Sequence, residues 1–174
     1  DVDILLGPEM KSTGEVMGRA RNFPAAYAKA MAAAGMPLPQ GGKAFLSIRN
    51  EDKAEMLLIA TGLRDLGFEL YATAGTAQFL NGHRLGVKPI NKQHEGSPHC
   101  VEAIRDGKFA LVINTTSDEI AIRDSFSIRR ATLERKVPYS TVVASARAML
   151  QGIRETRDRT PEVLPLDPRR NLLS

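Results

Sequence analysis

The sequence predicts an α/β fold of Rossmann-like type, a parallel sheet with helices on both faces, and three observations support this. From residue 43 to residue 154, short apolar runs alternate with segments in which apolar residues recur at helical spacing. Glycines such as Gly67 and Gly107 stand just past these segments, where helices commonly end. The apolar run at residues 109–114 is typical of a strand buried on both faces. Strands that alternate with helices favour parallel pairing through right-handed crossovers.

The start of the chain lies outside this pattern. Residues 1–18 open on an apolar run without a partner strand nearby, so we expect them to be the last piece of a larger domain. Asn22 is a preferred N-cap, Pro24 suits a first helical turn, and residues 25–34 are rich in alanine. Residues 36–42 (MPLPQGG) predict a linker. The predicted organisation has four parts: tail 1–18, helix and linker 19–42, main domain 43–154, and a mobile C-terminal tail 155–174.

The first half of the main domain contains three predicted strands. Residues 44–48 form a short apolar run suited to a buried strand. Gly67 closes the helix that follows, whose apolar residues keep helical spacing: Met56, Ile59, Leu63 and Leu66. Residues 68–72 predict the second strand, residues 75–81 a short helix and residues 87–90 the third strand.

The second half completes the alternation. Ser97 predicts a helix cap with Pro98 at the first helical position and Gly107 past the end. Residues 109–114 (FALVIN) predict the central strand, and residues 137–143 the last strand. Two further helices are marked by apolar residues, the first by Ile122, Phe126 and Leu133, the second by Ala146, Met149, Leu150 and Ile153.

Composition limits the function classes. Of the 174 residues, 43% are apolar and 25% are charged, the balance of a soluble globular protein. No apolar run approaches the ~20 residues that span a bilayer, and we expect no membrane partner. The single Cys100 and three histidines argue against a disulfide framework and a zinc site, and fit a reducing cytoplasm. The net charge of +4 is spread along the chain with few aromatic residues, so a solvated basic surface is favoured over nucleic-acid binding.

Polar side chains follow four of the predicted strands. Because the carboxyl ends of parallel strands share one edge, these side chains should converge there. Gly75 lets a ligand approach the backbone, and the helix after it directs free N–H groups and its positive end at an anion. Thr73 and Thr76 add hydroxyls, and Lys53 and Lys92 add positive charge. The set suits a phosphate monoester, although for any single loop a role as a helix N-cap explains the residues equally well.

Acid–base chemistry has weaker support. The best candidates are His94, Glu95 and His99, and a histidine could transfer a proton near neutral pH. A histidine at a helix start is more often a hydrogen-bonding structural residue, which is the reading we favour. Cys100 is expected to pack as a small apolar residue. No catalytic residue is predicted.

Residues 41–153 resemble the methylglyoxal-synthase-like domain family, most closely the version at the C-terminal end of the carbamoyl-phosphate synthase large subunit. Three signatures carry the resemblance, namely ATAGT at residues 72–76, NKxHEGxPH at residues 91–99 and INTTS at residues 113–117. Two shorter motifs agree, IRR at residues 128–130 and KVPY at residues 136–139. Independently, residues 6–18 are similar to the C-terminal end of that enzyme's second ATP-grasp domain. The two similarities in this order are far more specific than either alone.

The resemblance implies an allosteric regulatory domain, not catalytic by itself, within a glutamine-hydrolysing, ATP-dependent ligase of pyrimidine and arginine biosynthesis. That enzyme makes carbamoyl phosphate from bicarbonate, glutamine-derived ammonia and ATP. No cofactor is expected in this segment, since ATP and Mg or Mn belong to the intact large subunit. Implied partners are UMP or IMP as effectors, the upstream synthetase domains, the glutamine amidotransferase small subunit and further copies of the large subunit.

The turn chemistry and the resemblance together assign effector binding to nine residues: Ser47, Lys53, Thr73, Gly75, Thr76, Asn91, Lys92, Asn114 and Thr116. The resemblance also assigns ornithine contact to Tyr139 and Thr141. Ser140 stands where bacterial relatives tend to carry aspartate, which argues against ornithine control. No residue is assigned to a metal.

Three alternatives remain. A standalone lyase of the methylglyoxal synthase type would need a Gly-Gly-Asp loop where this chain has His94-Glu95-Gly96. The cyclohydrolase domain of purine biosynthesis shares the Thr-x-Gly-Thr turn but not the other signatures. A purely structural domain with a vestigial pocket is the third.

Overall fold

The sheet has five strands, all parallel, in the order β3-β2-β1-β4-β5. The structure is a computed structural model that describes residues 16–115, 119–157, 159 and 163. The strands are β1 (Gly42–Ser47), β2 (Phe68–Ala72), β3 (Lys88–Pro89), β4 (Leu111–Asn114) and β5 (Tyr139–Ser140). The long helices are α1 (Phe23–Ala33), α2 (Lys53–Asp65), α3 (Ala74–Gly82), α4 (Cys100–Arg105), α5 (Glu119–Glu134) and α6 (Val143–Thr156). Two short 3₁₀ helices, η1 (Asn50–Asp52) and η2 (Gln93–Glu95), lie in loops after strands.

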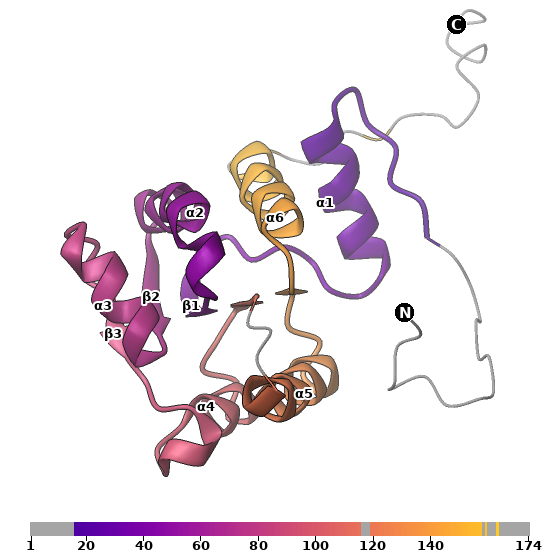
Figure 1. The fold of residues 1–174 in the computed structure, drawn as a ribbon. Coiled ribbons are helices and arrows are strands. Elements are labelled where there is room, and N and C mark those ends of the chain that lie inside the picture. Colours follow the sequence, from indigo (N-terminus) through magenta and orange to yellow (C-terminus); the bar gives the residue numbers. More distant parts are fainter. Residues whose placement is uncertain (1–15, 116–118, 158, 160–162, 164–174) are drawn as a thin grey trace, which may run out of the picture.

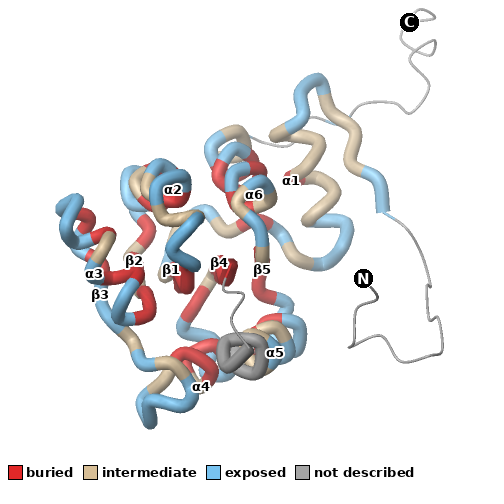
Figure 2. The backbone as a smooth tube through the Cα atoms, viewed as in Figure 1, coloured by how far each residue is buried: buried red, intermediate tan, exposed pale blue. Residues whose placement is uncertain are grey.

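Two apolar cores sandwich the sheet, as a fully covered parallel sheet requires. Side chains alternate across β1, so that Leu46 enters one core and Phe45 the other. The Leu46 side receives residues of α1, α2, α3 and α6, and the Phe45 side receives residues of α4 and α5 (Figure 1). Burial is concentrated on the central strands and on the inward helix faces (Figure 2). The predicted α/β class is confirmed.

The N-terminal helix packs on the last helix. Asn22 caps α1 as predicted, accepting a hydrogen bond from the Ala25 N–H at 2.9 Å. The predicted linker carries Leu38 into the core that α6 also lines. A Cβ at Gly152 would stand 2.5 Å from Leu38 Cδ1, so the close approach depends on glycine. Helix α1 and the linker are therefore part of the packed structure of the described chain.

Two details of the predicted elements are wrong. Helix α4 begins at Cys100 with His99 as its N-cap, because His99 and Glu102 exchange hydrogen bonds as a capping box. Ser97 instead donates to the Glu102 carboxylate at 3.0 Å. The last strand is only two residues long, and α6 already starts at Val143.

Helix α5 forms where the sequence predicts it, but two of the residues that mark it do not enter the core. Phe126 and Leu133, which mark the helix in the sequence, are 40% and 45% exposed. The buried face is formed by Ile128 and Ala131, which pack beneath α4. Ile122 belongs to the helix, but its side chain lies outside the described part. Among the described residues, no helix is both long enough and apolar enough to cross a bilayer.

Candidate functional site

The sheet reverses its direction of growth between β1 and β4. From β1 the chain adds β2 and β3 on one side and then crosses to place β4 on the other. Ligands of open α/β sheets bind outside the carboxyl ends of the strands at such a switch point. Ser47 and Asn114 are register partners at the ends of these two strands, and both are almost fully buried. Asn114 donates to Ser125 on α5 at 3.1 Å. The switch point thus has a polar floor.

The turn after β2 carries an open helix N-terminus. The Thr73 backbone is extended, and its side chain makes no capping bond to α3. The first N–H groups of a helix have no intrahelical acceptor, so those at the start of α3 remain available to a ligand. Gly75 is exposed in this first turn. The predicted anion-binding turn therefore has the backbone geometry that it requires.

Thr76 is occupied by structural bonds. Its hydroxyl accepts the Ile48 N–H at 3.1 Å and the Thr73 hydroxyl at 3.3 Å, in a fully buried position. These bonds fasten the start of α3 to the end of β1. The structure thus gives Thr76 a structural role, while its predicted contact with an effector remains a prediction.

Lys53 brings a positive charge over the same turn. It is the first residue of α2, and its Nζ lies 4.0 Å from the point that a Cβ of Gly75 would occupy. The ammonium also lies 5.8 Å from the centre of the Phe79 ring. The structure therefore brings together Lys53, Thr73, Gly75 and Thr76. An anion at this turn would meet both the ammonium and the positive end of α3.

A second polar group at the switch point was not predicted from the sequence. Arg49 binds the Asp52 carboxylate through Nε at 2.7 Å and Nη2 at 3.1 Å. This bond and a hydrogen bond from the Thr115 hydroxyl lower the pKa of Asp52, and the Asp52 bond raises the pKa of Arg49. The arginine and aspartate stand three residues apart just past a strand, a spacing that could have indicated the pair.

The remaining predicted effector residues lie after β3 and β4. Asn91 donates to the Gly96 carbonyl at 3.2 Å, and the Lys92 N–H donates to Glu95 at 2.7 Å. Both bonds shape the loop that leads to α4. Thr116 lies outside the described residues. The loop starts beside the Gly75 turn, because the Ile90 N–H donates to the Ala72 carbonyl at 2.9 Å, but the part that Asn91 and Lys92 take in effector binding remains a prediction.

The candidate ornithine residues lie on the opposite side of the switch point, at β5. The Tyr139 hydroxyl is buried and has no hydrogen-bond partner among the described residues. Ser140 is buried, and its hydroxyl donates to the Val142 carbonyl at 2.8 Å. Thr141 follows at an intermediate exposure. A buried hydroxyl without a partner suits a ligand or a water molecule.

The acid–base candidates serve the loop structure. His99 Nδ1 accepts the Glu102 N–H at 3.3 Å, and Glu95 accepts the Lys92 N–H. The pKa of Glu102 is lowered by the His99 N–H and then by the Ser97 hydroxyl. Within the described ranges, no group of three or more His, Cys, Asp or Glu could hold a metal ion.

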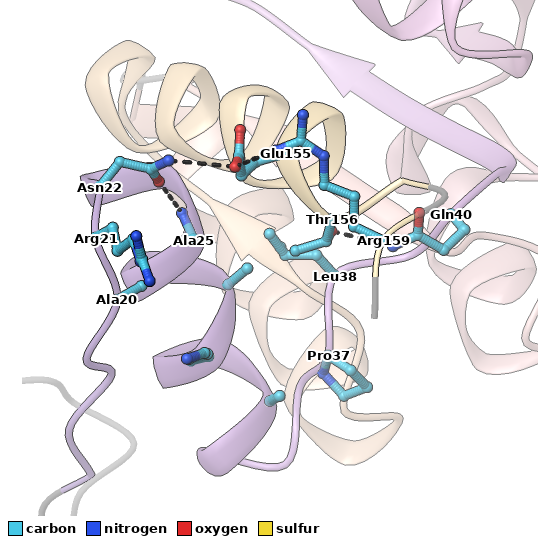
Figure 3. Close-up of a pocket in the computed structure, with 13 residues that line it drawn as sticks. Ala20, Arg21, Asn22, Ala25, Pro37, Leu38, Gln40, Glu155, Thr156 and Arg159 are labelled. Atoms are coloured by element: carbon cyan, nitrogen blue, oxygen red, sulfur yellow. Dashed lines mark hydrogen bonds and ion pairs between the residues drawn. The ribbon is translucent and has the colours of Figure 1, made fainter. Parts of the chain in front are cut away.

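Two large cavities in the described part do not include the Lys53 turn. One of about 580 Å³ is enclosed by α1, residues 37–40 and the end of α6 (Figure 3). Several of its polar groups pair with one another, since Glu155 accepts from Asn22 and Arg159, and Gln40 donates to Thr156. The other, of about 590 Å³, lies between Tyr71, Phe109 and α4. Neither is lined by a predicted effector residue. Because exposed helix N–H groups can bind an anion without a deep cavity, we place the candidate site at the Lys53 turn.

Comparison with known proteins agrees with this geometry. The family model described as "MGS-like domain" matches residues 55–141, half of the chain. A carbamoyl phosphate synthase large chain from Xanthomonas campestris is 49% identical over 152 residues, which are 87% of this chain and 14% of the relative. The large chains from Mesorhizobium japonicum and Myxococcus xanthus are 47% and 45% identical over 165 residues, covering 95% of this chain and 14% and 15% of theirs. The chain therefore spans about 14% of the length of such relatives.

Proposed function

Because the chain belongs to the MGS-like domain family, we propose that it is the regulatory domain of a carbamoyl phosphate synthase large chain and binds a nucleoside monophosphate at the carboxyl edge of its sheet. The phosphate occupies the turn that starts α3, and the base and ribose extend along the switch point between β1 and β4. In the complete enzyme, the chemistry with ATP and its metal ions belongs to the upstream domains. This domain shifts their activity without catalysing a step.

The position of Lys53 carries this proposal. Its ammonium lies above a helix turn that combines a glycine with uncapped N–H groups, at 4.0 Å from the Gly75 Cβ position. A phosphate oxygen between them would receive hydrogen bonds from both sides. Thr73 supports the proposal, because its side chain makes no capping bond to α3 and donates instead to Thr76, which leaves the first N–H groups of the helix open.

Calorimetric titration with UMP and IMP tests the proposal. Replacing Lys53 with alanine removes a charge-assisted hydrogen bond, which is worth about 1.5–3 kcal/mol, or roughly 10- to 100-fold in affinity. Lys108→Ala is the matched control, since it removes the same charge from an exposed lysine that precedes β4 at the opposite edge of the sheet. We expect the control to bind within about twofold of the parent chain, as surface charges far from a site do.

Two results would contradict the proposal. The first is the absence of binding for both nucleotides. The second is equal affinity of Lys53→Ala and Lys108→Ala. Turnover of dihydroxyacetone phosphate by the chain would instead favour the lyase alternative. In the complete enzyme, UMP or IMP should change the activity with a coupling of about 1–3 kcal/mol.

A further inference from the structure

A polar network joins the two loops that border the switch point. Thr115 follows β4, and its N–H donates to the Ser47 carbonyl at 2.9 Å. Its Oγ1 accepts the Arg49 N–H at 3.3 Å, and the same hydroxyl contributes to the lowered pKa of the Asp52 carboxylate. The loop after β1 and the loop after β4 are therefore held together by one threonine.

Asp52 is unusual in its position. It is the N-cap residue of α2 and a residue type preferred there, yet its side chain makes no capping bond. The carboxylate binds the Arg49 guanidinium instead. Only 12% of the Asp52 side chain is exposed, against 45% for Arg49. The Asp52 carboxylate is thus largely shielded from solvent, and the more exposed Arg49 side chain binds it.

The charge of Asp52 matters because Lys53 is the next residue. A carboxylate released from Arg49 could pair with the Lys53 ammonium, and it would repel an anionic ligand over the Gly75 turn. The bidentate bond from Arg49 neutralises the carboxylate and fixes its direction. In the described part of the chain, the Arg49 guanidinium pairs with Asp52 and not with the Gly75 turn, so its effect on a ligand would act through Asp52.

We propose that Arg49, Asp52 and Thr115 form a positioning network that leaves Lys53 free for the anionic ligand and sets the affinity of the site. The inference rests on the proposed nucleotide binding at the Lys53 turn. The competing explanation is a plain structural tie that stabilises the loops and does not affect the ligand.

A double-mutant cycle separates the two explanations. The 174-residue chain is titrated with UMP and IMP as the parent, as Arg49→Gln, as Asp52→Asn and as the double variant, with thermal unfolding measured for each. We expect Arg49→Gln to weaken binding about tenfold, because the carboxylate next to Lys53 in the chain then has no arginine to neutralise it. The double variant should return to within about threefold of the parent, since the interfering charge is gone. Asp52→Asn alone should bind at least as tightly as the parent.

A matched pair on the same helix provides the control. Arg64 and Asp65 form an exposed ion pair of 2.9 Å at the far end of α2. Arg64→Gln with Asp65→Asn should leave the affinity within about twofold of the parent. Thr115→Ser should retain the affinity of the parent and Thr115→Val should weaken it, because only serine keeps the hydroxyl.

The outcomes distinguish this inference from the proposed function. If the parent binds and Lys53→Ala weakens binding while Arg49→Gln does not, the network is only structural and the proposed function stands. If Arg49→Gln and the double variant are weakened equally, the loss comes from loop structure and the inference is overturned. If the parent binds neither nucleotide, the proposed function fails and the inference fails with it.

Discussion

Replacing Gly75 with alanine tests the location of the anion with little risk to the fold. The Gly75 backbone does not have a left-handed φ, and the nearest atom to an added Cβ is Lys53 Nζ at 4.0 Å, an ordinary van der Waals distance. Alanine is favoured over glycine within a helix by up to about 1 kcal/mol, and by less in the first turn. The free energy of unfolding should therefore stay equal or rise by a few tenths of a kcal/mol.

The same methyl group obstructs the proposed ligand position. An oxygen that bridges the α3 N–H groups and the Lys53 ammonium needs about 2.8–2.9 Å to each nitrogen. A Cβ at 4.0 Å from Nζ occupies that gap. We expect at least about tenfold weaker binding of UMP, which corresponds to about 1.4 kcal/mol.

Calorimetry and thermal unfolding of two variants provide the assay. Gly82→Ala is the control, because Gly82 ends the same helix and an added Cβ there meets nothing within 4 Å. It should leave the affinity unchanged. Equal affinities of Gly75→Ala, Gly82→Ala and the parent chain would refute the placement of the anion. A clear fall in the melting temperature of Gly75→Ala would show that the glycine is needed for the fold.

Two further predictions concern packing and pH. Gly152→Ala should lower the free energy of unfolding by about 1–3 kcal/mol, because the new Cβ would stand 2.5 Å from Leu38 Cδ1. Gly41→Ala is the control. An added Cβ there meets nothing within 4 Å, so the free energy of unfolding should change by less than about 0.5 kcal/mol. Equal denaturation midpoints for the two variants would contradict this packing. Glu102→Gln should be less stable than the parent at pH 7 and equally stable at low pH. The reason is that the Glu102 pKa is lower in the folded chain than its unfolded value of 4.5. The ionised carboxylate therefore stabilises the fold above pH 4.5, and this contribution is lost as the pH falls through the folded pKa. Unfolding curves measured from pH 2 to pH 7 check this, and a stability difference that persists at low pH would argue against the bonds from His99 and Ser97.

Local signals in the sequence were reliable wherever a single segment determines the outcome. Residues 68–72 form β2 as predicted, Asn22 caps α1, and Gly67 and Gly107 follow helix ends with positive φ. Each of these depends on neighbouring backbone and on the intrinsic preference of one residue type. The Lys53 and Gly75 juxtaposition was also predictable in outline, because parallel strands bring their carboxyl ends to one edge.

Other features depended on contacts between distant segments. The choice of His99 over Ser97 as the α4 cap depends on where Glu102 points, and the exposure of Phe126 and Leu133 depends on which face α4 covers. The Arg49–Asp52–Thr115 network needs β1 and β4 side by side, although they are more than 60 residues apart in the chain. The packing of Leu38 on Gly152 likewise joins the two ends of the described chain.

The sequence by itself determined the order of strands and helices, the edge of the sheet that carries polar residues, and the family. These follow from periodicity, turn residues and motifs that lie within short segments. The tertiary structure decided which hydroxyls are occupied, since Thr76 bonds to Ile48 and Thr115 to Arg49. It also decided that the Lys53 ammonium lies near Gly75 and the Phe79 ring, while the Asp52 carboxylate pairs with Arg49. The physical reason is that a hydrogen bond is settled by which atoms meet in space, and residue type alone does not specify that.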